Sequence, residues 1–458
     1  WTIDETYSLD DFKHLPAPPA KPTTKRATVT PDQDTPQRFR EFVANNPNSE
    51  LARLWQAGPD EVDGDRSKFD WIISNMLVAE GYSDTEIASI LMGYSGSKAA
   101  ERGGDYLART IANAREAVSS RVASSEDALA LEFAGIHRDE LRYVDPWGKW
   151  FWWDGTKWSE DKTRETYDMV RTVCRKAAAA AIMNNDKSSK ALLKANTVAA
   201  VERLAKADRR MAATDDQWDS DPLLLNTPSG IVDLGENVGA ISPHRSDAYM
   251  TKCTAAPVGG PCLLWVDFLH QIMNGDEELV AFLQRLCGYA LTGSTEEHAL
   301  FFLYGTGGNG KSVFIDTVSG VMGDYSRTAP METFAASHGD RHPTELAGLR
   351  GARLVCATET EEGRRWSEAK IKQITGGDKI SARFMRQDFF EFKPQFKLVI
   401  AGNHKPGLRS VDEAMQRRFH LVPFTVNIPK PEQDKELGEK LKAEWPGILQ
   451  WMIDGAKE

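Results

Sequence analysis

One segment of the chain, GTGGNGKS, combines residue types that can hold a phosphate chain. Its glycines permit a tight backbone that aims N–H groups inward at an anion. A lysine placed directly after such a loop can reach the β- and γ-phosphates, and the hydroxyl that follows can ligate Mg²⁺. We therefore predict that ATP and Mg²⁺ bind at Gly305, Thr306, Gly307, Gly308, Asn309, Gly310, Lys311 and Ser312.

The residues on either side of this segment are those that such a loop requires. Residues 299–304 form a continuous apolar run, which is typical of a strand buried on both faces. After Lys311, apolar residues recur at Phe314, Val318 and Val321, which is the spacing of a helix. A glycine-rich turn that arose by chance would need neither neighbour. The context therefore favours phosphate binding.

Two further polar residues follow apolar runs, as active-site residues follow parallel strands. Glu359 comes after residues 353–358, and Asn403 comes soon after residues 396–401. The carboxyl ends of parallel strands meet at one edge of a sheet, so we expect both side chains near the loop. We predict that Glu359 helps to hold the metal and polarises the attacking water, while Asn403 senses the γ-phosphate. The alternatives are a solvated acid and a turn-forming asparagine.

A cation is also needed, because negative charge develops on the phosphate oxygens in the transition state. Arg417 and Arg418, in the stretch DEAMQRRFHLVPF, are the candidates. An arginine pair before a strand is more often a surface feature, so the residues alone do not assign this role.

The stretch TGGDKISARFMRQDFFEFKPQ mixes cations with aromatic residues. Lys379, Arg383 and Arg386 are interleaved with phenylalanines, among them Phe384 and Phe389. This mixture suits a hairpin that grips single-stranded DNA through phosphate contacts and stacking. An ordinary exposed hairpin is the alternative.

Composition and periodicity predict the elements that position these residues. They divide the chain into a linker or arm (1–38), a helical module (39–120), a helical and mixed domain (121–294), an α/β domain with a mostly parallel sheet (295–427), and C-terminal helices that begin a further domain (428–458). Within the helical module, Ser83 and Glu86 form a capping box. The fold class is therefore an α/β domain preceded by mostly α-helical domains.

Five tryptophans lie close together around a predicted hairpin turn at Asp154-Gly155. They are Trp147, Trp150, Trp152, Trp153 and Trp158. Such a set can form a stacking platform for bases, but more often it is the core of a small sheet.

The bulk properties set wider limits. The net charge of −11 does not exclude a nucleic-acid partner, because binding depends on where the basic groups lie. Five cysteines without a C-x-x-C pair argue against a zinc site and a disulfide framework. No apolar run is long enough to predict a membrane span, so we expect a cytoplasmic protein. Because the chain starts at Trp1, we also expect it to be part of a longer protein.

Taken in order, the motifs resemble those of superfamily-three helicases, specifically the helicase part of phage and plasmid primase–helicases, a group that includes the poxvirus primase–helicase. The matching text is LYGTGGNGKSVF, RLVCATETEEGRRWSEAKIKQITGGDKISAR, FEFKPQFKLVIAGNHKP and DEAMQRRFHLVPF. The region from about residue 125 resembles the domain that precedes the helicase in this family. Residues 39–120 resemble the helical module that follows a primase–polymerase domain.

This resemblance implies a P-loop NTPase fold of the AAA+-like type. It implies that Gly305–Ser312 is the Walker A loop, that Glu359 is the leading acid of Walker B, and that Asn403 is the sensor. Lys379, Arg383 and Arg386 fall on the motif with the DNA-gripping hairpin. Arg418 matches the arginine finger, with Arg417 as the weaker candidate. Thr360 follows Glu359 where some relatives have a second acid, and Glu361 could take that duty.

The implied activity is that of an ATP-dependent DNA helicase in phage or plasmid replication, working as a homo-hexameric ring on single-stranded DNA in the host cytoplasm. A primase–polymerase domain would precede Trp1 in the same full-length chain. An initiator or DNA-binding scaffold that uses ATP only to assemble is the main alternative, and a small-molecule P-loop kinase is a distant third.

Overall fold

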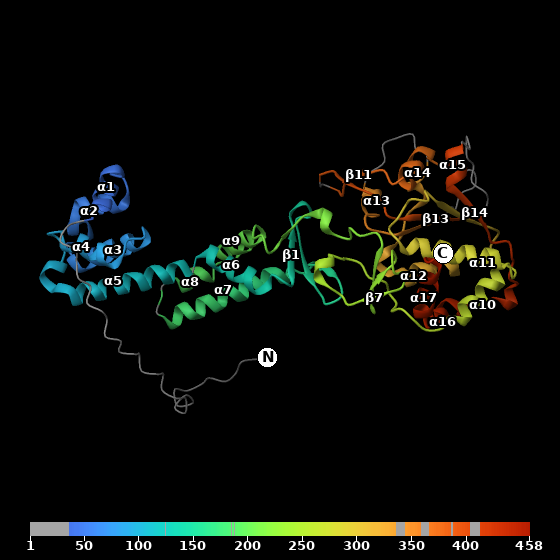
Figure 1. Ribbon diagram of the computed structural model, residues 1–458, viewed down its shortest axis with the longest axis horizontal. Coiled ribbons are helices and arrows are strands. Elements are labelled where there is room, and N and C mark those ends of the chain that lie inside the picture. Colours follow the sequence, from blue (N-terminus) through green and yellow to red (C-terminus); the bar gives the residue numbers. More distant parts are fainter. Residues whose placement is uncertain are drawn as a thin grey trace, which may run out of the picture. The chain divides into compact units, whose positions relative to one another are not determined.

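The structure is a computed structural model that describes residues 36–123, 125–184, 186, 188–335, 344–358, 366–385, 388–403 and 413–458. Contacts divide the chain into two compact units, Trp1–Leu129 with Cys174–Thr197, and Ala130–Val173 with Val198–Glu458. Figure 1 draws the first unit mainly in blue and cyan and the second from green to red. The predicted domain boundaries stay predictions, since this division does not test them.

The first unit contains a helical core, as its periodicity predicts. Its helices include α1 (Gln37–Asn45), α2 (Glu50–Ala57), η2 (Gly58–Val62), α3 (Arg66–Ala79), α4 (Asp84–Met92) and α5 (Ala99–Ala123), the last interrupted by non-helical angles at Gly103. On α3, Phe69, Ile73 and Leu77 are fully buried in one cluster. The predicted capping box is confirmed: the Ser83 N–H donates to the Glu86 carboxylate at 2.8 Å, and the Glu86 N–H donates to the Ser83 hydroxyl at 3.3 Å.

The middle of the chain combines long helices with a small sheet. The helices are α6 (Glu126–His137), α7 (Glu165–Met183), α8 (Ser189–Leu192) and α9 (Ala195–Lys206). The strands are β1 (Leu141–Val144), β2 (Lys149–Trp153), β3 (Trp158–Glu160) and β4 (Ala212–Ala213), in the order β3-β2-β1-β4. The predicted hairpin turn is confirmed: Gly155 has a φ of 93°, and the Asp154 side chain accepts from the Thr156 N–H at 2.8 Å.

The tryptophan-rich stretch forms the core of this small sheet. Trp158 is 1% exposed and packs in a cluster with Phe151 and Trp218, and Trp147 lies partly buried against the same cluster. Trp150 is buried as well, and its indole N–H donates to Glu202 at 2.7 Å. The core interpretation is therefore confirmed for the buried rings, which cannot serve as a platform for bases.

A second small sheet and two helices lead to the α/β region. The sheet is antiparallel, with the order β5-β6-β7, and consists of β5 (Leu224–Thr227), β6 (Gly230–Asp233) and β7 (Ile241–Ser242). The helices are α10 (Leu263–Ile272) and α11 (Glu277–Leu291). Short 3-10 helices lie between β1 and β2 (η3, Asp145–Trp147), between β4 and β5 (η4, Asp215–Gln217) and after β7 (η5, Ser246–Ala248).

The predicted parallel sheet is confirmed, with five strands in the order β14-β8-β13-β10-β9. Their bounds are β8 (Leu300–Tyr304), β9 (Ser326–Thr328), β10 (Leu354–Thr358), β13 (Lys397–Gly402) and β14 (Phe419–Pro423). The remaining elements are α12 (Lys311–Met322), η6 (Gly323–Tyr325), η7 (Met331–Thr333), α13 (Thr344–Ala347), α14 (Glu368–Thr375), β11 (Ile380–Ala382), β12 (Phe390–Phe392), α15 (Glu413–Arg418), η8 (Lys430–Glu432), α16 (Leu437–Lys442) and α17 (Trp445–Gly455).

Both faces of this sheet are covered, which explains the continuous apolar runs of its strands. Along β8, Phe301 and Leu303 join one buried cluster with residues of α10, α11, α12 and α17, while Leu300 and Phe302 join another with residues of α14. Figure 1 shows α14 and α15 on one side of the sheet and α11, α12 and α17 on the other. Within the described ranges, no helix has both the length and the apolar character needed to cross a membrane.

Candidate nucleotide site and basic hairpin

The predicted phosphate loop lies between the end of β8 and the start of α12. Gly305, Gly308 and Gly310 have φ values of 155°, 78° and 82°. A Cβ on Gly305 would lie 1.9 Å from the carbonyl oxygen of Phe424, and one on Gly310 would lie 2.6 Å from Cγ2 of Ile272. Gly307 has nothing within 4 Å of such a Cβ. Three of the four glycines are thus required by the backbone and its neighbours.

Asn309 and Lys311 hold the inside of this loop. The Asn309 amide donates to the Phe424 carbonyl at 2.7 Å, and its oxygen accepts from Lys311 Nζ at 3.1 Å. The lysine amine also donates to the Gly305 carbonyl. Burial lowers the pKa of Lys311 below its usual range. The sequence predicts Asn309 among the ATP-binding residues of the loop, but it does not predict the bond to Phe424.

A cavity of about 410 Å³ opens beside the loop, at the carboxyl ends of β10 and β13. Its lining is formed by Lys311, Ser312, Ile315, Asp316, Thr358, Ala401, Gly402 and Asn403. The structure therefore brings three predicted site residues, Lys311, Ser312 and Asn403, to one cavity. Glu359 directly follows Thr358 in the chain but lies outside the residues that the structure describes, as does Glu361.

The chemistry of this lining suits a phosphate chain with a hard cation. The N-terminus of α12 and the Lys311 amine favour an anion. Within the described ranges, no group of three or more His, Cys, Asp and Glu residues could hold a metal. A Mg²⁺ ion here would take oxygen ligands from Ser312 and the phosphates, which matches its habit of using few protein ligands.

Asp316 is the lining residue that the sequence analysis missed. It lies four residues after Ser312 on α12, so the two side chains share one face of the helix. Its carboxylate can accept hydrogen bonds from waters around a metal. The signal was present in the helical spacing, once the start of the helix at Lys311 was assigned.

Arg418 lies at the amino-terminal end of the parallel strands, whereas the loop lies at their carboxyl end. Phe419 pairs with Leu300 and Pro423 with Tyr304, so the arginine precedes the start of β14 while Gly305 follows the end of β8. The register places Arg418 level with Ala299, and the six residue steps from there to Gly305 amount to about 20 Å along a strand. Arg418 Nη1 donates to the Ala414 carbonyl at 2.7 Å, and the residue is not part of the cavity lining. Arg417 is exposed.

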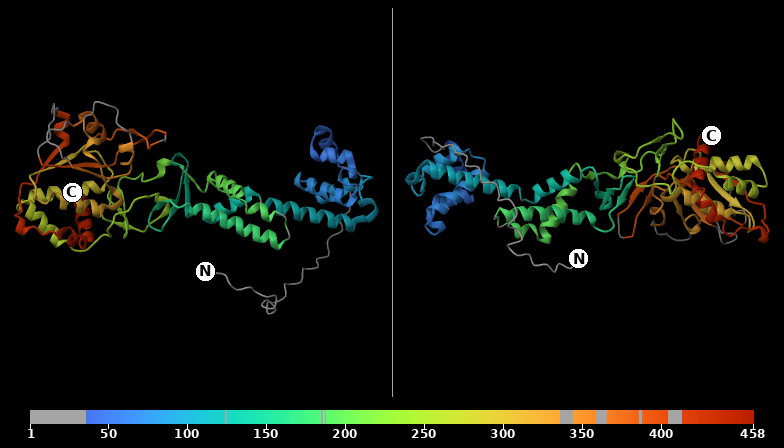
Figure 2. Two further views of the ribbon diagram at one scale, coloured as in Figure 1. Left: turned by 180° about the vertical axis from the view of Figure 1, so that it is seen from behind. Right: turned by 90° about the horizontal axis from the view of Figure 1, so that it is seen from below.

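The basic and aromatic stretch forms the predicted hairpin. β11 and β12 pair antiparallel, with Ile380 opposite Phe392 and Ala382 opposite Phe390. Figure 2 shows this hairpin extending from the body of the sheet. Its role in DNA binding stays a prediction.

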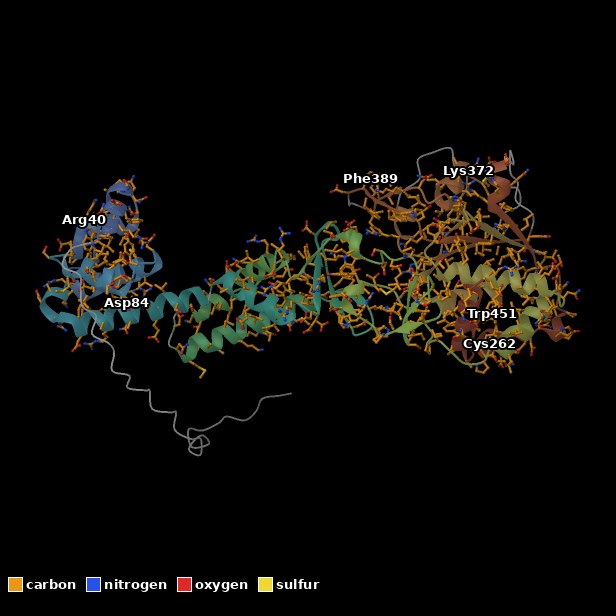
Figure 3. All side chains as sticks on the ribbon, viewed as in Figure 1. Arg40, Asp84, Cys262, Lys372, Phe389 and Trp451 are labelled. Carbon is orange, nitrogen blue, oxygen red and sulfur yellow. The ribbon has the colours of Figure 1, made fainter. Side chains whose placement is uncertain are left out.

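Three apolar side chains of the hairpin are exposed, alongside polar ones such as Ser381, Asp388 and Glu391. Phe384, Met385 and Phe389 are 42%, 66% and 59% exposed. Figure 3 labels Phe389 at this edge of the molecule. Arg383 Cζ lies 4.6 Å from the centroid of the Phe389 ring, and Lys379 Nζ lies 3.9 Å from the Glu391 carboxylate. Arg386 lies outside the described ranges.

Comparison with known families and proteins gives two regions of similarity. Residues 130–274 match the family described as D5 N terminal like, and residues 303–418 match a family of unknown function, DUF5906. The chain is 30% identical over 181 residues to "Putative helicase L207/L206" of Acanthamoeba polyphaga mimivirus, which covers 39% of this chain and 18% of that protein. It is 26% identical over 206 residues to "Putative helicase 022R" of Frog virus 3 (isolate Goorha), which covers 43% of this chain and 21% of that protein.

The chain spans about a fifth of the length of these curated relatives. Among solved structures, "The A form apo structure of NrS-1 C terminal region-CTR" is similar with a TM-score of 0.43 and 10% identity, over 69% of this chain and 68% of that chain. A likeness of that size carries no argument about the site.

Proposed function

We propose that the chain is the motor of an ATP-dependent DNA helicase that acts in DNA replication. The resemblance to phage and viral primase–helicases, together with the viral relatives named above, supports this proposal. The observation that carries the proposal is the cavity that joins Lys311, Ser312 and Asn403 at the carboxyl ends of parallel strands. The order β14-β8-β13-β10-β9 supports a P-loop NTPase fold of the AAA+-like, superfamily-three type.

In this proposal each residue acts on ATP at a stated place. Backbone N–H groups of the loop and the Lys311 amine hold the β- and γ-phosphates. Mg²⁺, when bound, neutralises charge on these phosphates. The Ser312 hydroxyl holds the metal, Glu359 orients and polarises the attacking water, and Asn403 donates to the γ-phosphate.

The cation of the transition state would come from a neighbouring subunit. Arg418 is about 20 Å along the sheet from its own loop, so it cannot serve the ATP of its own chain without a large rearrangement. In a homo-hexameric ring it would meet the ATP of the next subunit. The hairpin residues Lys379, Arg383 and Arg386 would then face single-stranded DNA in the pore. A primase–polymerase domain in the same full-length protein, as the resemblance of residues 39–120 implies, completes the proposed set of partners.

ATP hydrolysis in the presence and absence of single-stranded DNA tests this proposal. We expect DNA to stimulate hydrolysis, Lys311→Ala to abolish it, and Glu359→Gln to bind ATP but not hydrolyse it. A normal rate in Glu359→Gln would show that the strand before it has been assigned the wrong role. Hydrolysis or phosphate transfer by a monomer that ignores DNA would favour a small-molecule kinase instead.

A further inference from the structure

The hairpin β11–β12 has too little pairing of its own to hold a fixed orientation. Each strand contributes three residues to the ladder, and a two-stranded sheet of that size is marginal in water. Its inner side is secured, because Ile380, Ala382 and Phe392 are buried in the core beside α14. Phe390 is only partly buried against that core, so the outer side of the hairpin depends on other contacts.

Arg350 supplies such a contact. Its guanidinium carbon lies 5.4 Å from the centroid of the Phe390 ring and 4.6 Å from the centroid of the Trp147 ring. Nη2 donates to the Asp215 carbonyl at 3.2 Å and lies 3.7 Å from the Asp215 carboxylate. A planar guanidinium can contact two ring faces and a carbonyl at once, which an ammonium group cannot do as well.

The two rings that Arg350 contacts belong to different parts of the second unit. Trp147 packs on Phe151 at 5.5 Å and on Trp218 at 5.8 Å, within the aromatic cluster of the four-stranded sheet. Phe390 stacks on Phe384 at 5.8 Å, near the exposed end of the hairpin. Contacts thus run from the aromatic cluster through Arg350 to the hairpin. Gln395, just after β12, adds a bond to the Asp219 carbonyl at 3.3 Å.

We propose that Arg350 is a positioning residue that fixes the hairpin β11–β12 against the aromatic cluster of the four-stranded sheet, so that the hairpin meets single-stranded DNA in one orientation. The DNA part of this inference rests on the proposed function, whereas the fixing of the hairpin does not. It also gives the tryptophan-rich sheet a role in the motor, as the support for the hairpin.

Arg350→Met, which keeps an unbranched, flexible side chain and removes the guanidinium, tests the positioning role without DNA. Hydrogen exchange of the amides of Ile380–Ala382 and Phe390–Phe392 should become about three- to tenfold faster, as the loss of a cation–π contact predicts. Arg350→Lys should lie between the variant and the wild type. In a Phe390→Leu background, Arg350→Met should add little, because the shared contact is already lost.

A matched control is available in the first unit. Arg38 Cζ lies 4.2 Å from the centroid of the Tyr82 ring, and its Nη2 donates to the Glu80 carbonyl at 2.9 Å. Arg38→Met removes the same kind of contact and should leave exchange in the hairpin unchanged. Unchanged hairpin exchange in Arg350→Met would overturn the inference, as would faster exchange spread evenly over the four-stranded sheet.

Binding to single-stranded DNA at several salt concentrations separates positioning from direct contact. Arg350→Met should weaken binding about three- to tenfold and leave the salt slope of the affinity unchanged. Neutralising Lys379 or Arg383 should lower that slope by about one. A slope lowered by one in Arg350→Met would mean that Arg350 itself contacts a phosphate, and would overturn the inference. A wild-type protein that binds no DNA would instead contradict the proposed function, while hydrogen exchange would still decide whether Arg350 fixes the hairpin.

Discussion

At the scale of single residues, the hydrogen bond from the Asn309 amide to the Phe424 carbonyl shows that a sequence motif does not specify every contact of its residues. The loop, its lysine and its hydroxyl are all local features, and their identity and order predict a phosphate site. The partner of Asn309 lies 115 residues away, and no local pattern specifies that contact. Asp316 differs from Asn309 in this respect, because helical spacing alone places it on the face of α12 that carries Ser312.

The glycines of the loop give a prediction at this scale. Gly310→Ala should weaken ATP binding strongly, because its φ of 82° costs an L-residue about 1–2 kcal/mol and the new Cβ would clash with Ile272. Gly307→Ala is the matched control, since nothing lies within 4 Å of its Cβ position. Fluorescent ATP titration checks both variants. Equal binding by the two would contradict the loop geometry described here.

At the scale of elements, apolar runs predicted the strands β8, β10 and β13 of the parallel sheet, and helical spacing predicted α12, whereas no apolar run predicted the short strand β9. The carboxyl ends of parallel strands lie together, and this rule predicted that Lys311 and Asn403 lie close to each other. The burial of two basic side chains could not be predicted in this way. Arg353 directly precedes β10 and Lys397 begins β13, and they are 2% and 1% exposed, although basic residues are rarely buried to that degree.

These two buried basic side chains secure the sheet to the elements before it. Arg353 donates to the carbonyls of Leu291 and Leu224, each at 2.6 Å. Lys397 Nζ donates to the carbonyls of Thr292 and Ser294. The last carbonyls of α11 have no partner within the helix and are therefore available as acceptors. Their partners depend on the tertiary fold, so sequence periodicity could not reveal them.

Lys397 gives a prediction about pH. Burial lowers the pKa of native Lys397 well below the ordinary range. In the unfolded chain the pKa of a lysine is about 10.4. At a pH between these two pKa values, the unfolded chain binds more protons than the native one. The stability that Lys397 contributes therefore rises with pH through this window and is lost as pH falls toward the native pKa. Urea unfolding should show that the difference in the free energy of unfolding between wild type and Lys397→Met grows from pH 8 to pH 10.

At pH 10 the variant should be less stable by roughly 1–3 kcal/mol, because buried carbonyls lose a donor. Lys393→Met, at an exposed position shortly before Lys397, is the control and should not show the growing difference. A difference that shrinks as pH rises would contradict the sign.

At the scale of the whole molecule, the two regions of family similarity do not coincide with the two compact units. Residues 303–418 lie within the second unit, but residues 130–274 include Cys174–Thr197, which groups with the first. Helical periodicity predicts that α7 and α9 are helices; it does not tell which half of each helix packs with which unit. The sequence therefore predicts the elements of this region better than their grouping.

The shared site of the proposed ring can be tested by mixing variants. Arg418→Ala should bind ATP nearly normally and hydrolyse it about a thousandfold more slowly, and Lys311→Ala should be inactive. Mixed rings should regain some activity, because certain interfaces then pair an intact loop with an intact arginine. Exchange of the two variants into common rings must first be shown by a labelled-subunit assay. With exchange established, a mixture that never exceeds its parents would place the arginine within its own subunit or outside the reaction.

Strand displacement on a forked DNA tests the central claim most directly, because it requires the nucleotide site, the hairpin and the ring together. Wild-type protein with ATP and Mg²⁺ should separate the strands of the fork, whereas Lys311→Ala under the same conditions should leave the duplex intact. An initiator or scaffold that uses ATP only to assemble would bind the same fork and release no strand. Binding and ring formation without any ATP-dependent release of the displaced strand would contradict a helicase and favour that alternative.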